Sequence, residues 1–557
     1  MATSGTRPQN KRDDFVIQGA ILAGASVLTR IIGAIYRIPV TNIIDDVGNG
    51  IYGNAFEVYS ITLILSSLSL PVVVSRLVSS RVALGQWRNA HRVFVTAMMF
   101  AIVVGIVAFA VVFFGANFIT AELIRAPMSF FAMRVLAPGL LLVAVTGVLR
   151  GYFQGLGTMI PTAASQIIEQ IFNAIVSIVG ASVLFGVGLQ LSQTTGDEHL
   201  QYAYGAAGGT LGTVAGTLFG FAFLVFLYML YRKVVNRRVR RDQNHRDESY
   251  SSILKTLVMT LVPIIFSSTI YSIGAIVGLT VFNRILEYQG FPEPDYLAMQ
   301  GIVTGRYNVM VRIPQGISNG FAASVVPGIA AAITMRNFKM MRQKIDASYK
   351  FIFLITIPCT VGFIALASPL MHLLFRGDQS RAAELLVIGA ITVVFYSLAT
   401  VSNSVLYALN KANITARNAL IGFVIQIATL VLMLVVFRAN EVALVASYIT
   451  FSGSMCILNM LSIRKYSKYR MDLVNSIFRP VIASIIMGVV AYGVQHGLAL
   501  LIHHRIATIV AILVAMVVYA VAIIKIGTLS EEIILGMPKG AAIDRFVRKM
   551  RLYPKVK

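Results

Sequence analysis

Two arginines lie within the first long apolar run of the chain, residues 14–42. Arg30 and Arg37 are roughly two helical turns apart, so their side chains share one face and lie about 10 Å apart along the helix axis. Gly33 falls between them on that face and leaves room for a bulky group. An arginine at membrane depth costs roughly 2.5–3.5 kcal/mol, and such residues usually face a bundle interior or a water-filled cavity. The spacing therefore predicts a cationic cavity inside a membrane.

A second pair of arginines, Arg306 and Arg312, follows in the later segment GRYNVMVRIPQG. They point in different directions on an ideal helix, but Pro314 and Gly316 predict a bend that relaxes this constraint. The pair indicates a second cationic helix lining the same cavity, and guanidinium groups match phosphate oxygens bidentately. An alternative stays open for both residues, in which the side chain reaches out to the membrane interface.

The amino-terminal half also places carboxylates and further arginines within apolar runs. Glu57 follows Asn54 by three positions, Glu169 lies in SQIIEQIFN, and Arg134 and Arg150 precede it in another run. One interpretation is structural pairing between these carboxylates and arginines. The other is a proton relay or a gate, because ionisable residues inside a membrane are costly and often functional.

The sequence lacks the patterns of an enzyme. We find no nucleophile elbow, phosphate-binding loop or metal-ligand cluster. Cys359 and Cys456 lie in apolar stretches without metal-ligand spacing, and the neighbours His503 and His504 indicate a metal site only weakly. We therefore predict no catalytic residue, no metal and no cofactor.

The composition indicates an all-α polytopic membrane protein. Hydrophobic residues make up 57% of the chain and charged residues only 13%. The formal net charge of +24 lies in short connections between apolar runs, which is the pattern of cytoplasmic loops. We therefore predict the bilayer as partner and exclude nucleic acid. The first apolar run is too long for a signal peptide and is expected to remain as an anchor.

Runs of about 20 apolar residues predict transmembrane helices. About fourteen such runs are present, near 15–40, 52–80, 93–117, 128–151, 161–187, 203–231, 253–283, 299–331, 348–375, 382–408, 414–437, 442–462, 478–500 and 506–526. With both termini in the cytoplasm, about thirty Lys and Arg fall in the inner connections and about five in the outer ones. The basic connection 232–252 is interpreted as an inner loop near anionic lipid, with binding of a cytoplasmic partner as the alternative.

Short matches indicate that the chain repeats itself. IGAI at 32–35 recurs at 273–276, TA at 162–163 recurs at 415–416, and Pro71 has a counterpart in Pro327. Since six helices separate the halves, both insert with the same orientation, which predicts a parallel repeat. The two prolines are hinge candidates, with simple helix kinks as the alternative. The predicted parts are a cytoplasmic amino terminus (1–14), a first six-helix lobe (15–231), the basic connection (232–252), a second six-helix lobe (253–462), two further helices (463–527) and a basic amphipathic cytoplasmic tail (528–557).

Several longer motifs resemble one family of membrane transporters. RGYFQG at 150–155, followed by PTAASQIIEQ at 161–170, is similar to the SpoVB/YtgP-type polysaccharide transporters. LTRIIGAIYRIP at 28–39, SLPVVVSRLVSSRVALG at 69–85 and LYALNKANITARNALIG at 406–422 fit the same family. That family belongs with the MurJ flippases in the multidrug/oligosaccharidyl-lipid/polysaccharide exporter superfamily. The resemblance implies a bacterial plasma-membrane protein with alternating access, whose cargo is an undecaprenyl-diphosphate-linked sugar.

The family's cationic cavity matches this sequence only in part. Thr29–Gly33 resembles the Ser-Arg-hydrophobic-hydrophobic-Gly run of MurJ proteins, so the resemblance transfers Arg30 as a diphosphate ligand. Arg37 lies one position away from the second MurJ arginine, and Asn54 stands where MurJ proteins place an aspartate. The spacing from arginine to proline in the eighth helix also differs, which leaves Arg306 and Arg312 both as candidates.

The leading hypothesis is a flippase for a lipid-linked cell-wall precursor, with lipid II for peptidoglycan first. Arg30, Arg37, Arg306 and Arg312 would bind the diphosphate, and Gly33, Asn54, Glu57, Arg134, Glu169, Pro71 and Pro327 are cavity or gating candidates. A flippase for another lipid-linked glycan, such as a capsule, teichoic acid or exopolysaccharide unit, shares the same chemistry. A cation-coupled drug exporter and a scaffold among cell-wall synthesis proteins are further alternatives.

Overall fold

A computed structural model describes residues 10–66, 69–242, 247–527, 545 and 548. These residues are helical with connecting turns and contain no strand, which confirms the all-α prediction for the described part. The contacts divide the chain into two compact units, Met1–Gly305 and Arg306–Lys557. The predicted division at 232–252 rests instead on the sequence repeat. The contacts do not test that repeat, so those boundaries stay a prediction.

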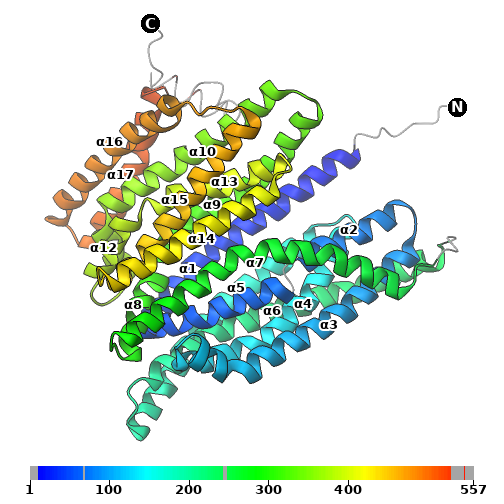
Figure 1. The fold of residues 1–557 in the computed structure, drawn as a ribbon, viewed down its shortest axis with the longest axis horizontal. Helices are drawn as coiled ribbons and strands as arrows, with labels where there is room; N and C mark the ends of the chain where they lie inside the picture. Colours follow the sequence, from blue (N-terminus) through cyan, green and yellow to red (C-terminus); the bar gives the residue numbers. More distant parts are fainter. Residues whose placement is uncertain (1–9, 67–68, 243–246, 528–544, 546–547, 549–557) are drawn as a thin grey trace. The chain divides into compact units, whose positions relative to one another are not determined.

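The first unit contains the helices before Arg306 (Figure 1). They are α1 (Asn10–Ser66), α2 (Leu70–Ala83), α3 (Trp87–Asn117), η1 (Phe118–Leu123), η2 (Pro127–Ser129), α4 (Phe130–Gly155), α5 (Ile160–Thr195), α6 (Leu200–Arg240), α7 (Tyr250–Tyr288) and α8 (Glu293–Gly301). The π-helical turn η3 (Ile302–Tyr307) contains the boundary between the units.

The second unit contains the later helices. They are α9 (Asn308–Thr334), α10 (Phe338–Ala365), α11 (Ala367–Leu374), α12 (Ser380–Gly389), α13 (Thr392–Ala408), α14 (Ala412–Val435), α15 (Asn440–Ser467), η4 (Val474–Phe478), α16 (Arg479–Ala499) and α17 (His504–Lys525). The predicted tail helix, 528–557, lies outside the described residues apart from two positions.

Ten described helices are long and apolar enough to cross a membrane, or eleven if α12 and α13, bent by 44°, form one span. The predicted count of fourteen is therefore not confirmed. One reason is that the first predicted span, 15–40, and the start of the second, 52–80, both lie in α1, which is kinked at Asp45 (φ 57°). The carbonyl of Asp45 accepts a 2.7 Å hydrogen bond from the Asn49 amide, which supports a main-chain conformation (φ 57°, ψ −175°) that residues other than glycine rarely adopt.

Small residues bring α5 and α6 into direct backbone contact in the first unit. A Cβ atom built on Gly208 would lie 2.1 Å from the carbonyl oxygen of Gly180, and one built on Gly216 would lie 2.4 Å from that of Glu169. Small residues allow helices in a membrane to approach in this way. The contact fixes the face of α5 that carries Glu169 and Asn173.

The remaining core of the first unit is apolar and aromatic. The ring of Phe94 on α3 lies 4.4 Å from that of Tyr152 on α4 and 5.1 Å from that of Tyr228 on α6. Val78 of α2 and Ile253 of α7 are fully buried in the same cluster. The start of α7 is therefore part of the first unit's core.

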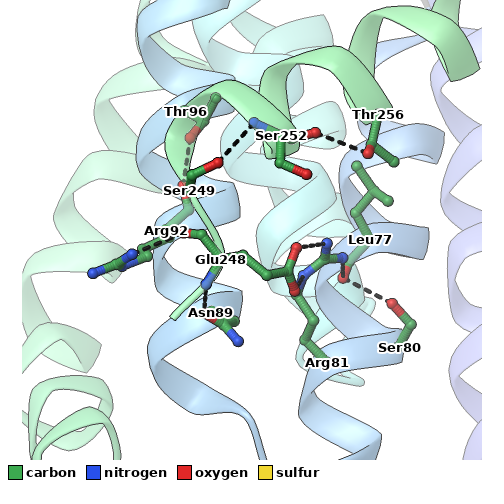
Figure 2. A network of polar contacts seen from close by, with 10 residues as sticks. All are labelled: Leu77, Ser80, Arg81, Asn89, Arg92, Thr96, Glu248, Ser249, Ser252 and Thr256. Carbon is green, nitrogen blue, oxygen red and sulfur yellow. Dashed lines mark hydrogen bonds and ion pairs between the residues drawn. The ribbon is translucent and has the colours of Figure 1, made fainter. Parts of the chain in front are cut away.

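Figure 2 shows how polar contacts anchor the connection before α7 on the bend between α2 and α3. Arg81 binds the carboxylate of Glu248 with two donors, one of them Nε at 2.8 Å. Arg92 pairs with Asp247 at 2.7 Å and donates to the main-chain oxygen of Glu248, and Ser249 caps α7 by accepting from the Ser252 amide. The acidic end of the basic connection is thus anchored by arginines of the first unit.

The second unit has its own apolar core. Ile329, Ile345, Val401 and Ile463 are buried together, and they come from α9, α10, α13 and α15. The α16–α17 pair packs onto α10, where the hydroxyl of Tyr519 donates a 2.8 Å hydrogen bond to a main-chain carbonyl.

Candidate functional site

Arg37 is half-buried on α1, and two residues after the Asp45 kink hold its guanidinium group. Its Nη2 atom donates a 3.2 Å hydrogen bond to Oδ1 of Asn49. Its Cζ atom lies 3.7 Å from the centroid of the Tyr52 ring, which is a cation–π contact. The kink turns the chain back so that Asn49 and Tyr52 reach the preceding arginine. These contacts orient a half-buried cation, which is the arrangement expected of an anion-binding group.

Arg30 lies two turns earlier on α1 and is exposed within the unit. Gly33 lies between the two arginines against α5, where a Cβ atom would lie 2.9 Å from Nε2 of Gln170. Any larger residue at position 33 would displace the Gln170 amide. The shared helix therefore presents two guanidinium groups, and Gly33 allows the polar face of α5 to approach them.

A row of polar side chains on α5 continues this surface. The amide of Asn173 donates to the hydroxyl of Tyr36 at 3.2 Å and to Gln170 at 3.4 Å. One turn earlier, the carboxylate of Glu169 pairs with Nη2 of Arg150 on α4 at 2.6 Å, and Nε of Arg150 donates to Ser165 at 3.0 Å. The polar face thus runs from α1 across α5 to α4.

The Arg150–Glu169 pair is partly accessible, with 16% and 26% of the two side chains exposed. The proposed structural pairing of embedded carboxylates with arginines therefore has one direct example. The pair also leaves the carboxylate with a fixed partner, so a role in gating requires that the pair separate.

The second unit has a polar network at positions that the predicted repeat matches to this one. In the register set by TA162–163 and TA415–416, Asn403 and Asn418 stand at the positions of Arg150 and Ser165. The amide of Asn459 donates to Asn403 at 2.7 Å and its oxygen accepts from Asn418 at 2.9 Å. In this predicted register, the second unit joins α13 and α14 through neutral amides by way of α15, where the first unit joins α4 and α5 by a charged pair.

Arg306 and Arg312 differ in their surroundings. Arg306 is only 5% exposed, and its Nη1 atom donates to the main-chain oxygen of Asp378 at 2.8 Å and to Gln379 at 2.7 Å. These contacts tie the start of α9 to the connection before α12. Arg312, in contrast, is exposed on α9. The two do not converge on one group, so Arg312 is the stronger candidate for contact with a ligand.

Asn54 is buried in a reciprocal amide pair rather than exposed to a cavity. Its Nδ2 and Oδ1 atoms each lie 2.9 Å from the side-chain amide of Gln300 on α8, and both residues are at most 1% exposed. Two satisfied amides join α1 to α8, which suits packing better than ligand binding.

The remaining candidates are scattered. Glu57 is half-buried on α1. Arg134 is exposed on α4, with its Cζ atom 4.3 Å from the Phe130 ring and 5.0 Å from the Phe113 ring. Pro71 opens α2 and packs against Gly151 of α4, and Pro327 lies within α9, but its side chain is outside the described set.

Sequence reasoning missed Asn49, Tyr52 and Gln300. A signal for Tyr52 was present, because Tyr52, Phe56 and Tyr59 recur at helical spacing and their rings pack in series. The contacts of Asn49 and Tyr52 with Arg37 depend on the kink at Asp45, which the sequence pattern did not indicate. Within the described residues, no group of three or more His, Cys, Asp or Glu side chains is placed to hold a metal ion.

The comparisons with known proteins agree with the resemblance seen in the motifs. The chain is 24% identical over 520 residues to the lipid II flippase MurJ of Bacillus subtilis (strain 168), covering 90% of this chain and 92% of that protein. It is 24% identical over 552 residues to the uncharacterized membrane protein YabM, covering 96% and 97% of the two chains. It is 21% identical over 457 residues to stage V sporulation protein B, covering 82% and 84%. Both are from the same organism.

Solved structures share the fold. An inward-facing multidrug resistance MATE family transporter of the MOP superfamily aligns with a TM-score of 0.61 at 14% identity, covering 78% of this chain and 98% of that one. Lipid II flippase MurJ in an inward closed conformation aligns with a TM-score of 0.55 at 15% identity, covering 89% and 98%. The relatives whose activity is stated are transporters rather than enzymes. The polysaccharide biosynthesis protein family model matches residues 16–332, more than half of the chain, so this helical membrane protein belongs to that family.

Proposed function

We propose that this protein is a flippase that moves an undecaprenyl-diphosphate-linked cell-wall precursor, lipid II first, from the inner to the outer leaflet. The observation that carries the proposal is the guanidinium group of Arg37, which Asn49 and Tyr52 orient on the same helix as Arg30. Guanidinium groups held in this way suit the oxygens of a diphosphate. The similarity to MurJ along 90% of the chain supports a lipid-linked cargo.

In this proposal the chain acts by binding and orienting its cargo. Arg30 and Arg37 hold the diphosphate from the first unit, and Arg312 holds it from the second, while Arg306 positions the start of α9. The sugar occupies a polar cavity and the prenyl tail stays in lipid. Both termini lie in the cytoplasm, as the distribution of Lys and Arg predicts, and the two units exchange access between the leaflets.

The test is replacement of a host's lipid II flippase by this chain. We expect growth after depletion of the host protein, together with lipid II in the outer leaflet. Arg30→Ala is expected to abolish rescue while the protein still reaches the membrane. Arg438→Ala, which removes an exposed cation from the turn before α15, is the matched control and should rescue fully. Full rescue by well-expressed Arg30→Ala would contradict the proposed role of this arginine.

A second candidate cargo is another lipid-linked glycan with the same diphosphate, such as a capsule, teichoic acid or exopolysaccharide unit. Membership of the polysaccharide biosynthesis family and the similarity to stage V sporulation protein B support this second candidate cargo. Failure to rescue lipid II flipping despite good membrane expression would select this candidate. A drug exporter is disfavoured because Arg30, Arg37 and Arg312 would repel a cationic drug.

A further inference from the structure

The connection between α3 and α4 lies against the connection between α7 and α8, at the end of the first unit that the charge distribution predicts to be outer. Asn283 donates a 3.1 Å hydrogen bond to the main-chain oxygen of Ile124, and Arg284 donates one of 2.7 Å to that of Glu122. We call residues 118–129 and 283–296 the clasp. Its contacts join segments more than 150 residues apart in the sequence.

Arg125 stands at the centre of the clasp. It adopts a left-handed conformation (φ 58°), and its guanidinium lies 3.7 Å from both Glu122 and Glu287. Its main-chain oxygen accepts a 2.7 Å hydrogen bond from the hydroxyl of Tyr296. The main chain and the side chain of one residue are thus both bound by the opposite connection.

Glu293 is a carboxylate of the clasp that makes no ion pair among the described residues. It is half-buried at the start of α8, and its Oε1 atom accepts a 2.8 Å hydrogen bond from the main-chain N–H of Met128. In the described part of the chain, no lysine or arginine pairs with it. Glu287, by contrast, has Arg125. A carboxylate removed from water with one hydrogen-bond donor and no counter-charge favours its protonated form.

The charged groups around Glu293 reinforce this preference. Burial raises the pKa of Glu293 to about 7, the charge of Glu287 adds to the increase, and the Met128 N–H opposes it. On its own helix, Tyr296 is buried and neutral, and Asp295 is exposed.

The other elements packed there bring few cations. On the side of α1, Asp46 meets the far end of α8, at Gly301. Arg134 of α4 stacks on phenylalanine rings, and Arg284 of α7 is occupied by main-chain oxygens. Arg125 is shared between Glu122 and Glu287.

We propose that Glu293 is a proton-binding site created by closure of the clasp, so that protonation holds the α3–α4 connection against the α7–α8 connection and deprotonation releases it. The neutral carboxyl keeps a carbonyl oxygen to accept the Met128 N–H, so protonation preserves the hydrogen bond and removes the charge. The inference rests on the clasp alone and does not require any particular cargo.

The sign of the pH dependence follows from linkage. With the clasp apart, Glu293 is solvated and its pKa returns to the ordinary value near 4.5. The closed clasp therefore binds the proton more tightly. Closure is fully favoured below the pKa of the open state and weakens as the pH rises through about 7. Between pH 5 and pH 8 the closing equilibrium should fall by roughly one to two orders of magnitude.

The experiment measures distance across the clasp in the full-length protein in lipid nanodiscs without substrate. Spin labels are placed at Leu123→Cys and Tyr288→Cys, both exposed, after Cys359→Ala and Cys456→Ala. We expect the population at short distance to fall from pH 5 to pH 8. Glu293→Gln, which is neutral at every pH and still accepts a hydrogen bond, should keep the short distance at pH 8.

Asp295→Asn is the matched control, because it removes an exposed carboxylate from the same helical turn and should leave the transition at its original pH. Glu287→Gln should move the transition to lower pH by removing the neighbouring charge. A distance that does not respond to pH, or an unchanged transition in Glu293→Gln, would overturn the proposal. Since no cargo is present, neither result depends on whether the protein transports lipid II.

Discussion

At the scale of single residues, the structure separates arginines that the sequence presents as equivalents. Arg37 is oriented by an amide oxygen and an aromatic ring, Arg306 is engaged by the connection before α12, and Arg312 is exposed. The type of residue sets the charge, but its neighbours decide whether that charge binds a ligand or a loop. These contacts favour Arg37 and Arg312 over Arg306 as phosphate ligands.

The contacts of Arg37 predict a difference between guanidinium and ammonium. Arg37→Lys keeps the charge but loses the planar stack on Tyr52 and the fork that matches a phosphate. We expect affinity for undecaprenyl diphosphate to fall roughly fivefold or more, since a lost hydrogen bond is worth about 1 kcal/mol. Binding to the purified protein measures this. Arg438→Lys, in an exposed turn, should bind like the parent, and equal binding by Arg37→Lys would refute a guanidinium-specific contact.

The Arg150–Glu169 pair predicts a stability effect that distinguishes structural pairing from gating. Glu169→Ala leaves a partly buried arginine without its carboxylate and should lower the free energy of unfolding by roughly 3 kcal/mol. Thermal unfolding in detergent measures the loss. The exchange Arg150→Glu with Glu169→Arg should restore part of the stability. If it restores transport as well, the pair is structural, and restored stability without transport would favour gating.

At the scale of elements, backbone contacts between helices determine which faces meet. The approach of α6 to α5 at Gly208 and Gly180 fixes the polar face of α5, and the anchoring of Glu248 by Arg81 fixes the start of α7. Both depend on residues distant in sequence. Helix periodicity alone gives two faces of each helix, but not which neighbour each face meets.

The α5–α6 contact predicts a strong effect of one methyl group. Gly208→Ala places a Cβ atom against the main chain of Gly180, which cannot move as a side chain can. We expect the free energy of unfolding to fall by about 1–3 kcal/mol, as is typical of overpacking. Gly186→Ala, on an exposed face of α5 with no atom near the new Cβ, is the control and should not destabilise the protein. Equal melting temperatures for both variants would argue against close packing here.

At the scale of the whole molecule, the charges bear on what drives transport. Because the proposed cargo is an anion bound by arginines, the membrane potential alone can favour its outward movement, and we expect transport without sodium. A negative head group moving outward is favoured by an inside-negative potential by roughly 2.3 kcal/mol per charge per 100 mV.

Proteoliposomes test this expectation directly. Replacing sodium by choline should leave the rate of flipping unchanged, and imposing an inside-negative potential on correctly oriented protein should increase outward flipping. Liposomes without protein control for leakage of the lipid. Dependence on sodium would contradict the expectation and indicate a cation site formed by other groups.

The sequence by itself determined the class of the protein. Long apolar runs can satisfy their main-chain polar groups in a bilayer only as helices or closed barrels, and their length here selects helices. The family follows from motifs such as RGYFQG and PTAASQIIEQ, and Arg30 and Arg37 follow from spacing on one helix. The pairing of Arg150 with Glu169 was anticipated as one of two interpretations, because a buried charge needs a partner.

Only the tertiary structure decided which partners these residues have. The kink at Asp45 brings Asn49 and Tyr52 to Arg37, and no helical periodicity continues through a left-handed residue. The amide pair between Asn54 and Gln300 and the clasp at Glu293 join segments more than 160 residues apart. Such contacts depend on how helices pack, and packing depends on backbone approach and side-chain shape, which a hydrophobic pattern does not encode.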